Sequence, residues 1–380
     1  MFGSEKIRGI VWQVLLLAAV VAGGWYLFSN TQANLARSNI QVGFGFLNRE
    51  AGFEIAESLV AYDATHTYGQ AFLVGIGNTL YVAFIGIILS TVLGTIVGIS
   101  RLSENWLVRK LASAYVEVMR NVPLLLQLLV WYAIFTELLP GVRQAIDLGG
   151  LVFLSQRGLR YAWPVSHSAY LYAGIAFVIG LVAFLFYRSY ARKRQQETGL
   201  QLSQLWPALG LILGLPVIAW LVGGAPTELE IPKVAGFDMQ GGKNISPEFT
   251  ALLIGLTTYT AAFIAEVVRG GILAVDKGQT EASQALGLAS GQRLRLVTLP
   301  QALRVIIPPM TSQYLNLTKN SSLAVAIGYP DLVSVANTSM NQTGQAIEAI
   351  AILMAVYLVI SLAIAVMMNI YNSRVRLVER

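Results

Sequence analysis

The sequence predicts an all-α protein that crosses a membrane about eight times. Of its 380 residues, 55% are hydrophobic and only 12% are charged, whereas soluble domains average roughly 45–50% and 25%. Apolar runs of about 20 residues, enough to span a bilayer core of ~30 Å, recur along the chain and end in basic or aromatic residues. The chain has no cysteine and only two histidines, His66 and His167. Thiolate, zinc and histidine-relay chemistry are therefore not expected.

We expect membrane spans at residues 10–28, 72–99, 115–139, 168–187, 205–223, 249–268, 303–327 and 347–370. The apolar run of the first span is longer than that of a signal peptide, and no small-residue cleavage site follows it. Residues 1–67 are therefore expected to form a retained anchor helix with an outer segment. In the second span, Gly94 and Gly98 have the four-residue spacing that lets helices approach closely.

The seventh span is less regular than the others. Pro308 and Pro309 stand together in it, and Lys319 interrupts its apolar pattern. A broken helix at membrane depth is tolerated only where it faces protein or a water-filled cavity. We expect such a break here, followed by an outer loop at residues 331–345 that either stays outside the membrane or re-enters it.

Basic residues predict the orientation of the spans. With the N-terminus in the cytoplasm, the inner segments hold 17 Lys and Arg residues and the outer segments hold seven. Short loops rich in Lys and Arg stay in the cytoplasm. Both termini, including the tail at residues 375–380, and the polar stretch 277–300 are therefore expected inside the cell.

The stretch 277–300 has the pattern of two short amphipathic helices. Thr280 can cap a first helix with Glu281 in its opening turn, and Gly287 suits the left-handed position after its end. Ser290 can cap a second helix, which runs toward Pro300. The pattern allows a plain connector, but also a rigid docking element that a partner outside the membrane pushes on.

The same stretch resembles the EAA loop of ABC importer permeases. Glu281, Ala282 and Ser283 stand where that family has Glu-Ala-Ala, and Val297 replaces the usual Ile. In this family the loop inserts into a groove of a cytoplasmic ATPase. The resemblance implies that the coupling residues are Glu281, Ala282, Ser283, Gly287, Leu299 and Pro300.

Further strings resemble the polar amino acid branch of these permeases. They are Gly75, Thr79-Leu80, Glu117, Arg120, Pro123, Gln127, Ala261-Ala262, Glu266, Arg269-Gly270-Gly271, Lys277, Gln279, Lys319 and Ser322-Leu323. Within the branch, the chain is similar to the first permease of general L-amino acid importers. The resemblance implies a type I permease fold over residues 68–374, with five core spans and the first, fourth and fifth spans as additions.

The resemblance also implies the function and the partners. The chain would be a permease subunit, not an enzyme, that carries L-amino acids of broad specificity across a bacterial inner membrane. It would work with a second permease subunit, two copies of a cytoplasmic ATPase and a periplasmic amino acid-binding protein. No cofactor is expected on this chain, since ATP and Mg would sit on the ATPase, and no nucleic acid is expected as a partner.

Lys319 is the clearest charge inside a predicted span. A Lys or Arg at the centre of a membrane helix costs about 2.5–3.5 kcal/mol, so it needs a partner or a function. Lys319 either pins the break in its helix through carbonyls or a carboxylate, or contacts the carboxylate of a substrate. Our candidates for the translocation pathway are Lys319, Asn316, Ser321, Ser322 and Gln127.

Two pairs of opposite charges stand three residues apart at the cytoplasmic ends of spans, Glu117 with Arg120 and Glu266 with Arg269. This spacing places each pair on one helix face. Each pair is either a salt bridge that sets the depth of its helix or part of a gate or partner contact at the inner mouth.

Two other classes of protein are compatible with parts of the sequence. A secondary transporter would also have broken helices and buried charges, but it needs no docking loop, and no carboxylate stands clearly at mid-membrane. A membrane-embedded enzyme would have only Ser321 or Ser322 with Lys319 as a nucleophile and base. The phosphate-binding pattern G-x-x-x-x-G-K-S/T is absent from the sequence, so energy from ATP must come from another chain.

Overall fold

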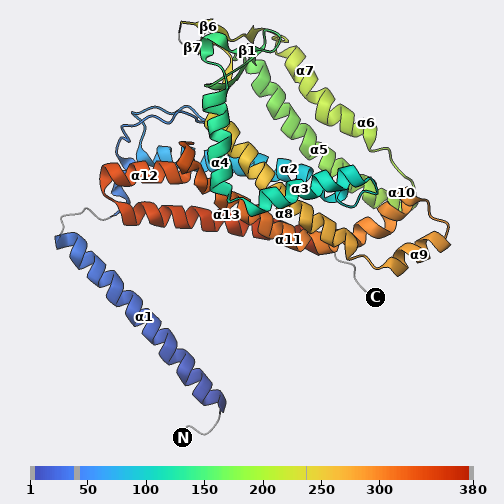
Figure 1. The fold of residues 1–380 in the computed structure, drawn as a ribbon, viewed down its shortest axis with the longest axis horizontal. Coiled ribbons are helices and arrows are strands. Elements are labelled where there is room, and N and C mark those ends of the chain that lie inside the picture. The colour runs from blue at the N-terminus through green and yellow to red at the C-terminus, as the bar shows by residue number, and fades with distance from the viewer. Residues whose placement is uncertain (1–4, 38–42, 237, 376–380) are drawn as a thin grey trace. The chain divides into compact units, whose positions relative to one another are not determined.

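The structure, a computed structural model, describes residues 5–37, 43–236 and 238–375. It divides into two compact units (Figure 1). The first unit contains Met1–Ala133 and Glu248–Arg380, and the second contains Ile134–Pro247. The second unit is therefore an insertion in the chain of the first.

Helices build the first unit. They are α1 (Glu5–Arg37), the 3₁₀ turn η1 (Phe44–Asn48), α2 (Tyr68–Ser100), α3 (Trp106–Asn121), α4 (Leu124–Ala133), α8 (Pro247–Leu273), α9 (Lys277–Ala285), α10 (Ser290–Arg293), the π-helical turn η5 (Leu294–Thr298), α11 (Leu299–Asn320), the 3₁₀ turn η6 (Ser321–Ile327), α12 (Leu332–Thr343) and α13 (Ala346–Val375).

The second unit combines two apolar helical stretches with short strands. Its elements are the π-helical turn η2 (Ile134–Leu138), the 3₁₀ turn η3 (Val142–Gln144), β1 (Ile146–Asp147), β2 (Val152–Ser155), β3 (Gly158–Tyr161), β4 (Trp163–Pro164), α5 (Ser168–Thr198), α6 (Leu205–Ala208), the π-helical turn η4 (Leu209–Gly214), α7 (Leu215–Val222), β5 (Leu229–Glu230), β6 (Lys233–Ala235), β7 (Asp238–Gln240) and β8 (Lys243–Ile245). Helix α5 packs against α7.

The strands form one four-stranded antiparallel sheet, in the order β1-β2-β3-β8, and two pairs, β4-β5 and β6-β7. In the larger sheet Val152 lies opposite Tyr161, and Leu159 lies opposite Ile245. The sequence predicted only polar segments here. Strands of two to four residues are too short to show the alternation of apolar and polar residues that reveals a strand.

Helices α2 and α8 pack closely because α2 carries glycine at the contact. A Cβ atom on Gly94 would lie 2.6 Å from Cγ2 of Ile264, and one on Gly98 would lie 2.7 Å from the carbonyl oxygen of Ala265. The close approach predicted for the second span is therefore confirmed. It fixes the position of α8, which lines both cavities of the candidate site.

The third predicted span, 115–139, is not one continuous helix. Helix α3 ends at Asn121, α4 begins at Leu124, and the two are bent by 104°. Pro123 has no N–H to continue the helix, and it holds Val122 in an extended conformation with φ −96° and ψ 127°. The expectation of a straight span is corrected by this bend.

Six helices in the described part of the chain are long and apolar enough to cross a membrane, or seven if the bent pair α3–α4 counts as one span. About eight were predicted. The difference is the predicted span 303–327, which is less apolar because α11 carries Gln313, Asn316 and Asn320. Helix α11 continues through Pro308 and Pro309, and the irregular part that was expected comes later, as the 3₁₀ turn η6.

Residues 331–345, expected as an outer loop, contain helix α12. Asp331 caps this helix, since its Oδ1 accepts a hydrogen bond of 2.8 Å from the N–H of Ser334. Asp331 is only 1% exposed, and burial raises the pKa of its carboxyl to about 7. Helix α12 and α2 then close over Phe46 of the outer segment, which is fully buried.

We expect Gly98→Ala to destabilise the first unit. The new methyl group meets the backbone of α8, which has no room to rotate away, and such overpacking costs about 1–3 kcal/mol. Gly77→Ala is the matched control in the same helix, because a Cβ atom there would come no closer than 3.9 Å to Leu59. Thermal unfolding in lipid nanodiscs should separate the two variants. Equal stability of both would show that the α2–α8 contact is not tight.

Candidate functional site

One cavity, of about 360 Å³, lies between α8 and α11. Its residues are Tyr259, Thr260, Phe263, Gln313, Asn316 and Asn320, and we call it the amide cavity. The α11 residues are spaced by three, four and seven, and on α8 both Tyr259 and Thr260 stand one turn before Phe263, so each set lies on one side of its helix. All of its polar groups are neutral amides or hydroxyls, which both donate and accept hydrogen bonds.

The amide cavity contains a buried hydroxyl that lacks a partner. Thr260 is 2% exposed, and its Oγ1 has no hydrogen-bond partner among the described residues. A buried polar group without a partner costs free energy, about 1–3 kcal/mol. Such a group is expected where a ligand or water completes the site.

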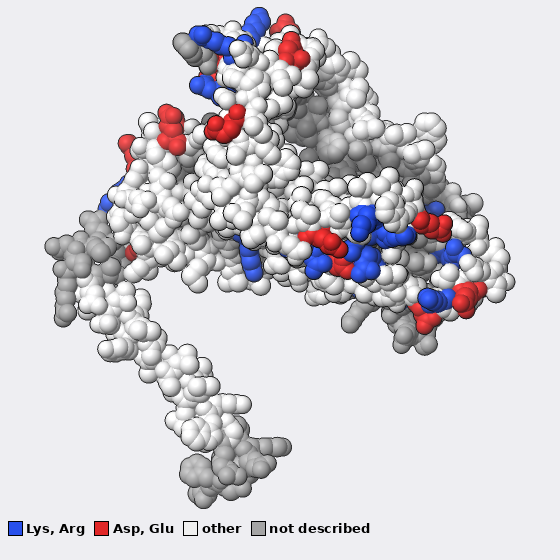
Figure 2. Space-filling view, viewed as in Figure 1, with Lys and Arg blue, Asp and Glu red and all other residues white. Residues whose placement is uncertain are grey.

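A second cavity, of about 420 Å³, is charged. Its residues are Arg101, Val116, Glu117, Arg120, Asn121, Phe263 and Glu266, and we call it the arginine vestibule. Charged side chains are few on the face seen in Figure 2, where blue and red atoms gather in separate patches on a mostly uncharged surface. The residues of this vestibule are therefore exceptional in an apolar molecule.

Glu266 is the centre of the charges in the arginine vestibule. Its carboxylate accepts hydrogen bonds from Arg101, which follows α2, and from Arg269 of α8, at 2.5 Å. Arg120 of α3 lies farther away, with Nη1 3.8 Å from Oε2 of Glu266. One carboxylate therefore ties together the ends of three helices.

The two predicted charge pairs have different outcomes. The pair of Glu266 and Arg269 forms an ion pair, as its spacing indicated. For Glu117 and Arg120 the expectation is corrected, because Arg120 reaches Glu266 instead and no ion pair joins it to Glu117 within the described chain. Glu266 of α8 lies within ion-pair distance of Arg120, and Glu117 is exposed at the vestibule wall.

Phe263 is a wall of both cavities. The guanidinium of Arg120 lies over its ring at 5.2 Å from the centroid, and the ring of Tyr259 packs against it at 5.0 Å. An arginine over an aromatic face contributes about 0.5–2 kcal/mol. The stacked pair of Phe263 and Arg120 thus separates the amide cavity from the arginine vestibule.

Of the predicted pathway residues on α11 and η6, Asn316 lines the amide cavity. Lys319 is exposed, and in the described structure no ion pair involves it. The hydroxyl of Ser321 donates to the carbonyl of Thr318, and that of Ser322 donates to the carbonyl of Lys319, each at 2.7 Å. These two serines satisfy carbonyls where α11 gives way to the 3₁₀ turn.

Gln127 lies at the bend between α3 and α4 and lines neither cavity. It is 7% exposed. Its Nε2 donates to the carbonyls of Met119 and Val122, at 2.9 and 3.0 Å. These carbonyls belong to the last turn of α3, which Pro123 leaves without helical partners. Gln127 therefore stabilises the bend.

The predicted docking stretch forms helices α9 and α10, with Gly287 between them. Gly287 has a φ of +74°, so its predicted left-handed conformation is confirmed. The predicted caps are corrected. Helix α9 begins earlier, because Asp276 accepts a hydrogen bond from the N–H of Gly278 at 2.6 Å and takes the place expected for Thr280.

At the second helix, Ser290 is the first helical residue and the cap is Ala289, whose N–H donates to the side chain of Gln292. Ser283 is buried and its hydroxyl donates to the carbonyl of Thr280. Glu281, Ala282, Leu286 and Leu299 are exposed, and Leu286 is 81% exposed. The stretch thus presents apolar side chains outward from two capped helices, which is typical of a docking surface.

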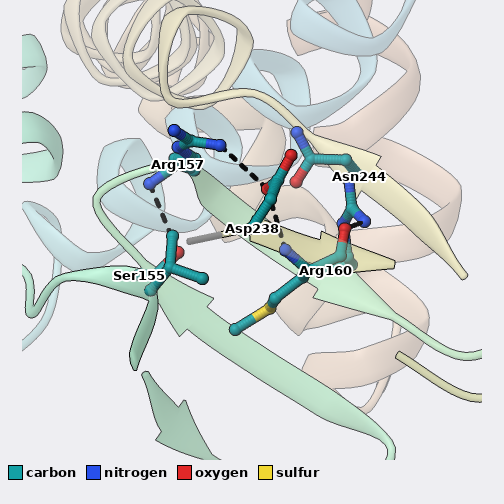
Figure 3. Close-up of a pocket in the computed structure, with 7 residues that line it drawn as sticks. Ser155, Arg157, Arg160, Asp238 and Asn244 are labelled. Carbon is teal, nitrogen blue, oxygen red and sulfur yellow. Dashed lines mark hydrogen bonds and ion pairs between the residues drawn. The ribbon is translucent and has the colours of Figure 1, made fainter. Parts of the chain in front are cut away.

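The second unit has a small cavity of its own, of about 180 Å³, at the sheet and β7 (Figure 3). Arg157 pairs with Asp238 at 2.9 Å, and Arg160 donates to the carbonyl of Met239. The N–H of Met239, and then Arg157, hold the pKa of Asp238 below its usual value. Each cation has a partner within this unit, so the contacts brace β2 and β3 against β7.

Sequence reasoning missed several residues of the two cavities. Tyr259, Thr260 and Phe263 share one face of α8, but aromatic residues and threonine in a membrane helix are common and gave no signal. Arg101 entered the sequence analysis only as one of the 17 basic residues of the inner segments. The described residues contain no group of three or more His, Asp or Glu that could hold a metal ion.

Comparisons with known proteins agree on one family. The family described as "Binding-protein-dependent transport system inner membrane component" matches residues 201–377. The chain is 48% identical to "General L-amino acid transport system permease protein AapQ" of Rhizobium johnstonii over 377 residues, covering 99% of this chain and 94% of the relative.

Two further relatives match over nearly their whole length. "Putative amino-acid ABC transporter permease protein YhdX" of Escherichia coli is 48% identical over 381 residues, covering 100% of this chain and 97% of the relative. "Glutamate/glutamine/aspartate/asparagine transport system permease protein BztB" of Rhodobacter capsulatus is 40% identical over 409 residues, covering 99% of this chain and 96% of the relative.

We expect Gln127→Leu to destabilise the bend between α3 and α4. The substitution keeps the volume but removes both hydrogen bonds, and each carbonyl left without a partner costs about 1–3 kcal/mol. Gln195→Leu, at an exposed position of α5, is the control and should stay within about 0.5 kcal/mol of the wild type. Thermal unfolding in nanodiscs measures both. Wild-type stability of Gln127→Leu would contradict the role of this side chain.

Proposed function

Because this chain belongs to the family of binding-protein-dependent transport system inner membrane components, we propose that it forms one half of the pathway through which an ATP-driven importer carries L-amino acids. Members of this family are multi-pass membrane permeases that work with an ATPase and a substrate-binding protein. The chain is thus a transport subunit and not an enzyme in its own right.

The proposed substrate class rests on the side chains that line the amide cavity. A free amino acid always has an ammonium and a carboxylate, and the cavity offers neutral donors and acceptors for both. Its described lining residues carry no fixed charge that would select one kind of side chain. The names of two relatives, one for L-amino acids in general and one for acidic residues and their amides, fit a site that recognises this shared part.

The docking stretch is proposed to be the contact with the ATPase. Glu281, Ala282 and Gly287 lie on or directly after α9, which follows α8 after only three residues. A push on α9 therefore reaches the helix that lines both cavities. ATP and Mg are assigned to the ATPase, and this chain binds no cofactor in the proposed assembly.

The remaining partners follow from the two cavities and from the charges. Both cavities are open on one side in this single chain, so a second permease subunit is proposed to close them. The distribution of basic residues supports cytoplasmic termini in the inner membrane, with a periplasmic amino acid-binding protein on the opposite side.

We expect Gly287→Val to uncouple transport from ATP hydrolysis. A β-branched residue with φ near +74° is strained by about 1–2 kcal/mol or more, which distorts the docking surface and should lower uptake about tenfold. Gly291→Val is the matched control, since Gly291 lies in α10 without a positive φ and has open space around it.

The test measures uptake of labelled L-amino acids and ATP hydrolysis together, with the whole complex in vesicles. The proposal requires ATP-dependent uptake that Gly287→Val impairs and Gly291→Val does not. Uptake that proceeds without ATP and collapses when ion gradients are dissipated would instead establish a secondary transporter.

A further inference from the structure

The amide cavity and the arginine vestibule share a single residue among the described side chains that line them, Phe263. Its ring is half-buried on the face of α8 that also carries Thr260 and Glu266. A solute that moves along α8 from one cavity to the other must therefore pass this ring. The ring of Tyr259 and the guanidinium of Arg120 both contact it.

Arg120 is the most weakly held of the three arginines around Glu266. Arg101 and Arg269 donate hydrogen bonds to that carboxylate, whereas Arg120 stays at 3.8 Å and is 42% exposed. Its second contact is the ring of Phe263. The guanidinium thus has free donors at the boundary between the two cavities, and losing its weak pair with Glu266 costs little.

The wall of the arginine vestibule carries two arginines and two glutamates, and Arg269, which lies outside the wall, adds a third guanidinium at Glu266. Arg101, Arg120 and Arg269 each pair with Glu266, and Glu117 is the other acid among the described residues of the cavity wall. The Nε atoms of Arg101 and Arg269 are buried without a hydrogen-bond partner in the described structure. Three guanidinium groups around two carboxylates leave room for one more anion, and a guanidinium binds a carboxylate in bidentate geometry.

We propose that the stacked pair of Phe263 and Arg120 is a gate, and that the carboxylate of the transported amino acid opens it by binding Arg120 in place of Glu266 and the ring. This inference rests on the proposed function and deepens it, since it names the group of the substrate that the gate recognises. When Arg120 turns to the carboxylate, the ring of Phe263 loses its contact with the guanidinium and is free to change rotamer.

The same gate is within reach of the docking stretch. Glu266 and Arg269 lie in the last two turns of α8, and Asp276, the cap of α9, follows shortly after. A displacement of α9 moves Glu266 relative to Arg120, which belongs to α3. The gate therefore responds to two inputs, the substrate carboxylate and the position of the docking stretch.

The experiment uses the absence of cysteine from this chain. Asn316→Cys places a thiol in the amide cavity, and a charged maleimide added to sealed inside-out vesicles of the whole complex reaches it only through the gate. The rate at which this chain is labelled is measured under three conditions: without ligand, with an L-amino acid, and with the corresponding amino acid amide, which lacks the carboxylate.

We expect slow labelling of Asn316→Cys and an increase of about tenfold with the amino acid but not with its amide. Phe263→Ala added to Asn316→Cys should label rapidly without any ligand. Arg120→Ala should also label rapidly and lose the response to the amino acid, while Arg120→Lys keeps part of the response. Arg109→Ala on the same helix, an exposed residue outside both cavities, is the control and should leave the rates unchanged.

Equal labelling rates for the parent, Phe263→Ala and Arg120→Ala would overturn the gate, and an equal response to the amide would overturn the recognition of the carboxylate. These results are distinguishable from a failure of the proposed function. Uptake by the same complex is measured in parallel. If ATP drives amino acid uptake but the labelling rate of the cysteine at position 316 does not respond to ligand or to the gate variants, only the gate is rejected. Absence of ATP-driven amino acid uptake in the wild type rejects the proposed function itself.

Discussion

The arginines at the joined ends of α2, α3 and α8 are partly buried and need an anion, and Glu266 is the carboxylate that all three reach. An isolated charge is costly where it is partly buried, so the position of each helix end depends on this one side chain. The glycine contact between α2 and α8 sets the same helices at close range through packing. Together, the ionic and the steric contact determine where the face of α8 lies.

That face of α8 connects every part of the candidate site. Tyr259, Thr260 and Phe263 border the amide cavity, and Phe263 and Glu266 border the arginine vestibule. The helix then ends at Leu273, three residues before α9. In the proposed mechanism, α8 transmits a movement of the docking stretch to the cavities, since this helix lines both of them and ends shortly before α9.

Much of this could be predicted from the sequence, because the signals are local. Apolar length indicated the spans, and the left-handed Gly287 and the glycines of α2 follow from steric rules that act within a few residues. The predictions that failed concerned contacts between residues that are distant in the sequence. The spacing of Glu117 and Arg120 could not reveal that Glu266, on another helix, takes the arginine, and the 104° bend at Pro123 could not be told from a tolerated proline in a straight span. Gln127 was named only through a family resemblance, and its role at that bend became visible with the carbonyls of Met119 and Val122.

The central claim is that α8 carries the motion of the docking stretch to the vestibule where Glu266 holds Arg101, Arg120 and Arg269. The most direct measurement is the distance between spin labels at Arg109 of α3 and Gly270 of α8, both exposed, in the complete complex in nanodiscs with and without trapped ATP. The account predicts a change in this distance when ATP is bound. An unchanged distance in a complex that still imports amino acids would contradict it.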